Sequence, residues 1–211
     1  MRLIPWCVLL LAAFPAVPQD QNALPPDINP VTLSRLPPVT AADLDEAGRR
    51  LLAERTAAPR PGPTHITAYS PRELDLGIPS GEKSPVGPRY FQLCALIAAR
   101  ESDQKYEWSS HEPAGRRQGL EQAVIDVVKY NRDVAGLSGK DAALITFGRA
   151  LFREHRVSSE LWGTMVRDFG RQRTVQLMMI MGDYYRVAIM LNAVDQHIPP
   201  DRQDLLPVVK R

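Results

Sequence analysis

The side chains best suited to chemistry are gathered in one short stretch of the chain, from Gln104 to Glu112. Within it, Glu107 and His111 are four residues apart, so on a helix they share a face, and Gln104 lies one turn earlier. A carboxylate beside an imidazole fixes which ring nitrogen carries the proton and raises the basicity of the ring. The spacing therefore indicates a general acid–base pair, although Glu–His pairs at this spacing also occur as plain helix contacts.

Metal binding is a weaker interpretation of the same residues. Glu107, His111, Glu112 and the distant His155 do not have the ligand spacing of a zinc or iron site. The expected site therefore has no metal and no organic cofactor. An acidic substrate would need a basic partner, for which the sequence offers three arginines near the pair, Arg100, Arg116 and Arg117.

Composition limits the classes of protein to which this chain can belong. The 211 residues are 44% hydrophobic and 24% charged, which is typical of one globular domain. The 26 basic and 24 acidic residues leave a formal net charge of +2. Nucleic-acid binding usually needs a concentrated basic face, so we expect no nucleic-acid partner.

The N-terminus has the pattern of a secretory signal peptide over residues 1–18. Arg2 precedes an uncharged, mostly apolar run of about 15 residues, shorter than the ~20 that span a bilayer. We therefore expect an exported protein, periplasmic or secreted, with no membrane segment once the signal is removed. Removal also takes away Cys7 and leaves Cys94, which lies in an apolar run and is expected to be a buried small hydrophobe.

Proline content divides the rest of the chain. Fifteen of the 19 prolines lie at or before Pro88, which predicts an extended Pro-rich arm over 19–40 and a loop over 58–88 with one short helix near 71–76. Apolar spacing predicts an all-α domain of about six helices over 41–197, with a polar tail at 198–211. The expected helices are 41–54, one from residue 89, 108–119, 122–130, 138–152, 157–169 and 171–194. The last is apolar on more faces than one subunit can cover, which indicates a subunit interface.

Residues 98–120 resemble the signature region of the carboxymuconolactone decarboxylase family, whose relatives include the alkylhydroperoxidase D-type proteins. The most specific part is the string Tyr-Glu-Trp-x-x-His-Glu-Pro at 106–113, and the likeness extends over most of residues 35–207. The resemblance implies an all-helical, alkylhydroperoxidase D-like fold and a homo-oligomer, often a trimer or hexamer. It also implies a site built around His111.

The resemblance also separates two activities within the family. In the peroxidase branch a Cys pair works with an upstream glutamate, and those positions fall here on Gln104, Glu107 and Gln92. Peroxiredoxin-type hydroperoxide reduction needs a thiolate and a resolving thiol. Neither of the two cysteine positions, Gln104 and Glu107, supplies sulfur, which disfavours this activity. Because the decarboxylase branch does not use the cysteines, an acid–base role for His111 with Glu107 is compatible with this sequence.

The resulting hypothesis is an exported decarboxylase-like enzyme that acts on a small carboxylate or lactone. His111 is the catalytic acid or base and Glu107 orients it. The expected substrate-binding residues are Gln92, Gln104, Tyr106, Trp108 and Tyr184. The alternative is a non-catalytic oligomeric binding protein with the same fold.

Overall fold

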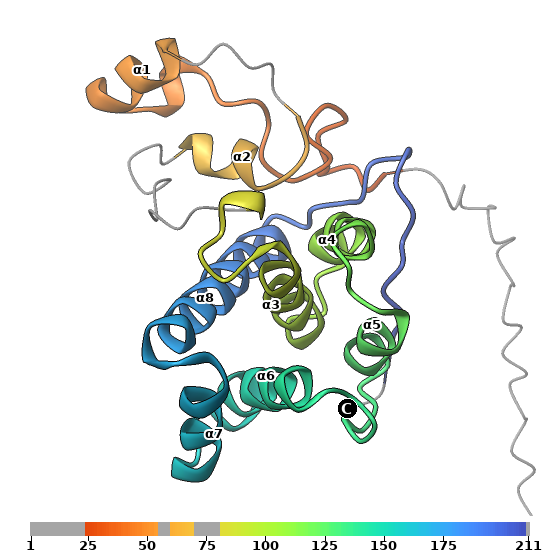
Figure 1. Ribbon diagram of the computed structural model, residues 1–211. Helices are drawn as coiled ribbons and strands as arrows, with labels where there is room; N and C mark the ends of the chain where they lie inside the picture. The colour runs from red at the N-terminus through yellow and green to blue at the C-terminus, as the bar shows by residue number, and fades with distance from the viewer. Residues whose placement is uncertain (1–23, 55–59, 70–80, 210–211) are drawn as a thin grey trace, which may run out of the picture.

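Helices supply the regular structure wherever the computed structural model describes the chain, in residues 24–54, 60–69 and 81–209 (Figure 1). These ranges contain no β-strand, so the predicted all-α class is confirmed. The α-helices are α1 (Glu46–Ala53), α2 (Pro63–Ile66), α3 (Pro88–Glu101), α4 (Lys105–Arg117), α5 (Gln122–Lys129), α6 (Gly139–Arg149), α7 (Ser159–Phe169) and α8 (Arg171–Ala193). A π-helical turn, Ala150–Glu154, continues α6.

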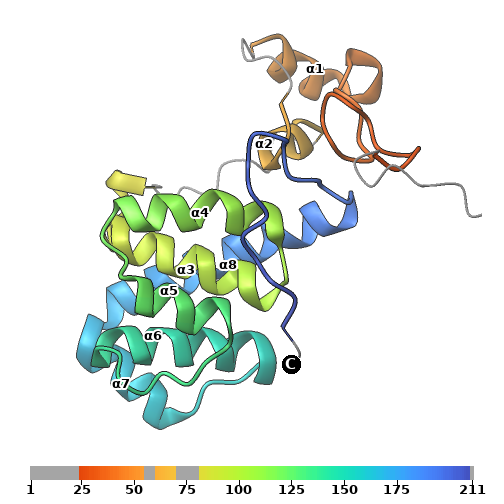
Figure 2. The ribbon, with the colours of Figure 1, turned by 90° about the vertical axis from the view of Figure 1, so that its right-hand side faces the viewer.

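Helix α3 forms the centre of the core. Every residue from Phe91 to Glu101 is buried, as the nearly all-round apolar pattern of this stretch predicts. Helices α4, α5, α6 and α8 pack around it (Figures 1 and 2). The site residues that α3 and α4 carry are therefore held by the best-packed part of the molecule.

Helix α4 begins at Lys105, three residues earlier than the apolar pattern suggests. The cause is Gln104, whose side-chain oxygen accepts a hydrogen bond from the Tyr106 backbone N–H at 2.7 Å and caps the helix. The earlier start places Glu107 and His111 in the same helix. Because they are four residues apart in that helix, their side chains lie next to each other on one helix face.

The segment before α1 differs from the expected extended arm. Residues 24–36 form turns that bury Ile28 and Leu33, and they pack against the end of α8. The Leu33 carbonyl accepts a hydrogen bond from the backbone N–H of His197 at 2.9 Å. The prolines of this segment exclude a helix but are compatible with tight turns. The buried side chains of Ile28 and Leu33 stabilise these turns.

The expected helix over 41–54 is split in two. A short 3-10 turn spans Ala41–Asp43, and α1 starts after Asp45, whose carboxylate accepts from the Gly48 backbone N–H at 2.7 Å. Both Thr40 and Asp45 are capping residues, and each begins its own helical piece.

The C-terminal segment is part of the domain rather than a polar tail. Leu206 is only 3% exposed and belongs to the main core cluster. The buried Arg100 donates to the Pro207 carbonyl at 2.9 Å. In Figure 2 this segment runs back from α8 across the end of α4 toward α5.

Two predictions fall on residues that the structure does not describe, the signal peptide at 1–18 and the short helix near 71–76. Within the described ranges, no helix combines the length and the apolar character that crossing a membrane requires.

Candidate functional site

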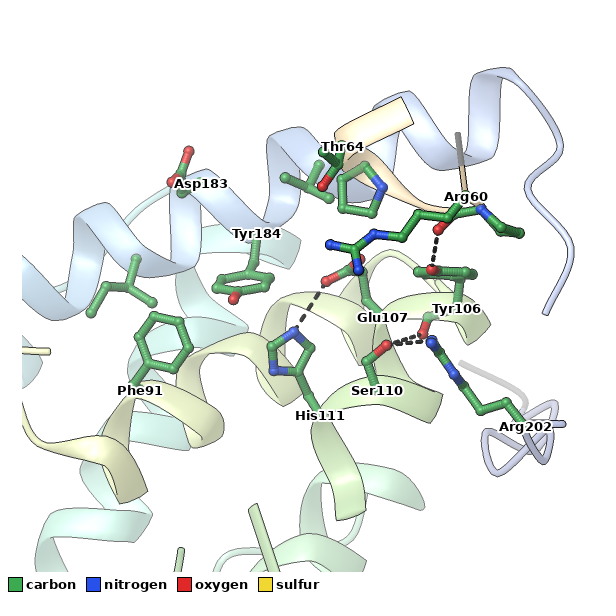
Figure 3. Close-up of a pocket in the computed structure, with 14 residues that line it drawn as sticks. Arg60, Thr64, Phe91, Tyr106, Glu107, Ser110, His111, Asp183, Tyr184 and Arg202 are labelled. Atoms are coloured by element: carbon green, nitrogen blue, oxygen red, sulfur yellow. Dashed lines mark hydrogen bonds and ion pairs between the residues drawn. The ribbon is translucent and has the colours of Figure 1, made fainter. Parts of the chain in front are cut away.

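His111 lies between two polar side chains that hold its ring from opposite sides. Nδ1 is 2.7 Å from the Oε1 atom of Gln92 on α3, and Nε2 is 3.3 Å from Oε2 of Glu107, one turn earlier on α4 (Figure 3). An amide oxygen only accepts hydrogen bonds, so Nδ1 carries a proton in this arrangement. The ring is therefore fixed in one orientation, and Nε2 is the nitrogen left for chemistry.

A cavity of about 430 Å³ opens beside the His111 ring. Its volume is within the range of small-molecule sites, about 300–1,000 Å³. The His111 side chain is 14% exposed and that of Glu107 is 4% exposed, so a ligand meets the imidazole more readily than the carboxylate. The cavity is lined by Arg60, Pro61, Pro63, Thr64, Phe91, Tyr106, Glu107, Ser110, His111, Ile180, Asp183, Tyr184, Val187 and Arg202.

Aromatic rings form one wall of the cavity. The Tyr184 ring meets His111 edge to face with 4.7 Å between ring centroids, and Phe91 packs against Tyr184 at 5.5 Å. Burial raises the pKa of the Tyr184 phenol well above its usual range, and the charge of Glu107 adds to the effect. Tyr184 is therefore a neutral hydrogen-bond donor at the cavity wall.

Two arginines supply positive charge to the same cavity. Arg202 donates to the Ser110 hydroxyl and lies over the Tyr106 ring, with its guanidinium carbon 4.7 Å from the centroid. Arg60 reaches over the cavity from the segment before α2 (Figure 3). Neither forms an ion pair with an acidic side chain in the described part of the chain, whereas Arg89 and Arg153 do. A guanidinium without a carboxylate partner at a cavity is suited to bind an anionic ligand.

Tyr106 links the cavity to the N-terminal segment. Its hydroxyl donates to the Pro61 carbonyl at 2.7 Å. Next to it, Gly62 has φ +119° and comes so close that a Cβ atom there would be 2.3 Å from the Tyr106 hydroxyl. This contact sets the position of Arg60, two residues earlier in the chain.

The structure brings most of the predicted site residues together. Glu107, His111, Tyr106 and Tyr184 line the cavity, and Gln92 supports the imidazole from behind. Gln104 does not line it, because its side chain caps α4 and donates to Asn192 Oδ1 at 2.7 Å.

Trp108 is also absent from the cavity wall. It is fully buried in the main core, and its indole N–H donates to Glu112. Burial opposes ionisation of Glu112, but hydrogen bonds from Arg116, Lys129 and Trp108 outweigh that effect and lower its pKa. This network fixes α4 against α5 and lies outside the cavity beside His111.

The arginines proposed from the sequence as carboxylate partners do not line the cavity. Arg100 is buried and bonds the backbone carbonyls of Lys129 and Pro207. Arg116 pairs with Glu112 at 2.6 Å, and Arg117 is exposed elsewhere on α4. Arg60 and Arg202 take this role instead. No spacing signal connects them to His111, because the fold brings them from two distant segments.

Cys94 is fully buried on α3, as expected for a small hydrophobe. Burial raises the pKa of its thiol, which disfavours the reactive thiolate. Among the described residues, no group of three or more His, Cys, Asp or Glu side chains is arranged to hold a metal ion.

Comparisons with known proteins add no further identification. No protein-family model matches the chain, and no curated protein matches it.

Proposed function

We propose that this chain is an acid–base enzyme, of carboxy-lyase type, that acts on a small carboxylate or lactone. The observation that carries the proposal is His111, held between Gln92 and Glu107 at the wall of a cavity that also contains Arg60 and Arg202, with which no acidic side chain of the described residues forms an ion pair. It combines a fixed proton-transfer group with a place for an anion, which are the two requirements for this chemistry.

Proton transfer is assigned to His111 with Glu107. With Nδ1 protonated toward Gln92, the Nε2 lone pair and the Glu107 carboxylate, 3.3 Å apart, can hold one proton between them. In a decarboxylation, the C–C bond to the carboxylate breaks, carbon dioxide leaves and the electron pair moves toward the neighbouring carbonyl. His111 then delivers the proton to the carbon that lost the carboxylate.

Substrate binding is assigned to the basic and aromatic parts of the cavity. Arg202 and Arg60 hold a carboxylate group of the substrate by charge-assisted hydrogen bonds. The neutral phenol of Tyr184 donates to the oxygen on which negative charge develops. The aliphatic side chains of Ile180 and Val187 cover the apolar part of the ligand.

The resemblance of residues 98–120 to carboxymuconolactone decarboxylases supports the same reaction class. As part of the proposal, the chain is an exported, homo-oligomeric relative of that family which lacks the redox cysteine pair of the peroxidase branch. The buried Cys94 gives thiol peroxidase chemistry no accessible nucleophile.

The test is carbon dioxide release from carboxymuconolactone by purified protein, with His111→Ala alongside. We expect release by the wild type and a loss of at least 100-fold in the variant, because a positioned acid–base group contributes about 10²–10⁴-fold. His155→Asn is the matched control, since His155 is exposed and lies outside the cavity. Equal turnover by the wild type and His111→Ala would disprove the role of His111, and no release by a folded wild type would remove this reaction.

A non-catalytic binding protein is the second candidate, and the positive charge that Arg60 and Arg202 bring to the cavity favours it. A binding protein needs the arginines but not the imidazole. Calorimetric titration with a small dicarboxylate separates the two cases. The second candidate would be established by three results together. The dicarboxylate binds without turnover, Arg202→Gln weakens this binding, and His111→Ala leaves it unchanged.

A further inference from the structure

Tyr106 on α4 contacts both of the segments that bring an arginine to the cavity. The Arg202 guanidinium lies over its ring, with the central carbon 4.7 Å from the ring centroid. Its hydroxyl donates a hydrogen bond at 2.7 Å to the carbonyl of Pro61, the residue after Arg60. Figure 3 shows the Tyr106 side chain between Arg60 and Arg202. One side chain therefore joins two segments that are far apart in the sequence.

The hydroxyl of Tyr106 is not available to a ligand as a hydrogen-bond donor. A phenol has one O–H group, and that of Tyr106 is used in the bond to Pro61. Burial raises the pKa of this phenol, while the charges of Arg202 and Arg60 act in the opposite direction. The phenol therefore stays neutral and keeps its proton, and both guanidinium groups are close enough for their charges to act on it.

The segment that carries Arg60 is fitted closely to the Tyr106 hydroxyl. The neighbouring Gly62 has φ +119°, a backbone conformation that favours glycine, and a Cβ atom there would be 2.3 Å from the hydroxyl oxygen. The Gly62 N–H donates to Gln196 Oε1 at 3.3 Å, which is long for a hydrogen bond. The bond from Tyr106 to Pro61 is shorter and lies next to Arg60 in the chain, so this bond sets the position of Arg60.

Arg202 has further support on the same helix. Its guanidinium donates to the hydroxyl of Ser110, which lies one turn after Tyr106 on α4. Two residues later, the carboxylate of Asp204 pairs with Lys105 at 2.5 Å and holds this segment against the start of α4. Neither contact involves the Tyr106 hydroxyl. The hydroxyl and the ring of Tyr106 therefore have separable tasks, one for each arginine.

We propose that Tyr106 is a positioning residue of this cavity, whose hydroxyl sets Arg60 and whose ring sets Arg202. It acts on an anionic ligand through the two guanidinium groups and not through a hydrogen bond of its own. The inference rests on the proposed anion site and applies equally to the enzyme and to the binding protein. Its consequence is that changes in one side chain affect the two arginines separately.

Calorimetric titration of the full chain with succinate tests the task of the hydroxyl. We expect Tyr106→Phe to raise the Kd about 2- to 12-fold, which corresponds to the loss of one neutral hydrogen bond. In an Arg60→Gln background the same change should have no further effect, whereas with Arg202→Gln the two losses should multiply. Tyr69→Phe is the matched control, because its hydroxyl also donates to a proline carbonyl, that of Pro37 at 2.8 Å, but lies outside the cavity. Wild-type affinity of Tyr106→Phe, or an equal effect with and without Arg60, would overturn the proposal.

Hydrogen exchange measured by mass spectrometry tests both contacts without a ligand. Each segment contains a bonded backbone N–H group, that of His65 at 3.1 Å in residues 60–66 and that of Arg202 at 2.9 Å in residues 198–203. Tyr106→Phe should speed exchange about 2- to 12-fold in residues 60–66 only, because it removes the hydroxyl and keeps the ring. Tyr106→Leu, which removes both, should speed exchange in the two segments.

Melting temperatures show whether each variant folds, and Tyr106→Met replaces Tyr106→Leu if the latter does not. Unchanged exchange of residues 60–66 in Tyr106→Phe, or of residues 198–203 in the variant without a ring, would overturn the proposal. A wild type that does not bind succinate would reject the proposed anion site, while the exchange pattern would still decide whether Tyr106 holds both segments.

Discussion

At the scale of single residues, the imidazole of His111 depends on two neighbours with different tasks. Gln92 accepts from Nδ1–H at 2.7 Å and fixes the ring, while Glu107 lies 3.3 Å from Nε2 and can share its proton. Gln92 is uncharged and cannot take part in proton transfer. The two roles are therefore separable by mutation.

Changing Glu107→Gln removes the charge and keeps the size of the side chain. We expect turnover to fall about 10²–10³-fold with little change in stability, because the amide still fills the buried position but cannot hold the shared proton. Steady-state kinetics and thermal melting measure the two effects. Asp183→Asn is the control, since Asp183 lines the cavity but pairs with Arg186 and points away from His111 (Figure 3). Full activity of Glu107→Gln would limit Glu107 to a structural role.

Changing Arg202→Gln should act on binding rather than on proton transfer. Loss of one charge-assisted hydrogen bond costs about 1.5–3 kcal/mol, which corresponds to a roughly 10–150-fold increase in KM or Kd for an anionic ligand. We expect kcat to change little, because the guanidinium acts on the bound carboxylate throughout the reaction. Arg167→Gln, at an exposed position on α7, is the matched control. An unchanged KM would show that the carboxylate binds elsewhere.

At this scale, sequence reasoning identified the residues that one helix brings together. Glu107 and His111 meet because their spacing matches the helix period. The same reasoning misplaced Trp108, since a step of one residue turns the side chain by about 100° and, here, into the core. Arg60 and Arg202 could not be predicted, because their position depends on how residues 60–66 and 198–209 fold onto α4.

At the scale of elements, apolar spacing and capping residues predicted most helices after residue 88. Ser138 and Ser158 cap α6 and α7 by accepting hydrogen bonds from the Asp141 and Leu161 backbone N–H groups, close to the expected helix starts at residues 138 and 157. The elements before residue 60 were predicted less well. Their turns depend on contacts with the segment that follows α8, such as the hydrogen bond between His197 and Leu33, and such contacts have no local signature in the sequence.

The crossing of α6 and α3 depends on the absence of a side chain at Gly148. Gly148→Ala would place a Cβ atom 2.4 Å from Ile97 Cγ2, within a core where both helices are fully packed. We expect a loss of about 1–3 kcal/mol in the free energy of unfolding. Gly163→Ala on α7 is the matched control, because nothing lies within 4 Å of its added Cβ atom, and it should gain about 0.5–1 kcal/mol. If urea unfolding gave the same change in the free energy of unfolding for Gly148→Ala and Gly163→Ala, the close crossing of α6 and α3 would be contradicted.

At the scale of the whole molecule, the described segments before α3 and after α8 converge on the cavity. The segment before α3 supplies Arg60 and the residues of α2, and the segment after α8 supplies Arg202. Gln196 joins these two segments to each other, since its side-chain amide donates to the carbonyls of Thr32 and Leu33. The site therefore depends on the packing of the N-terminal segment as much as on the central helices.

His65 on α2 makes that packing sensitive to pH. It is 5% exposed, with Nε2 3.4 Å from the Ser34 hydroxyl and its ring against Tyr69, and no acidic side chain bonds it in the described part of the chain. Burial lowers its pKa, while a backbone hydrogen bond at Leu36 opposes the shift in part. Below about pH 6.5 the unfolded chain gains a proton at this residue that the folded chain does not, so acid reduces stability.

We therefore expect the free energy of unfolding to fall as pH drops below about 6.5, with a contribution from His65 of up to roughly 1.4 kcal/mol per pH unit. His65→Gln should flatten this dependence, because the amide can still bond Ser34 but does not titrate. Urea unfolding of both proteins between pH 5 and pH 8 measures the difference, with His155→Asn as a control for an exposed histidine. If the two curves remain parallel, His65 does not link protonation to folding, and the N-terminal wall of the cavity is held by its apolar contacts alone.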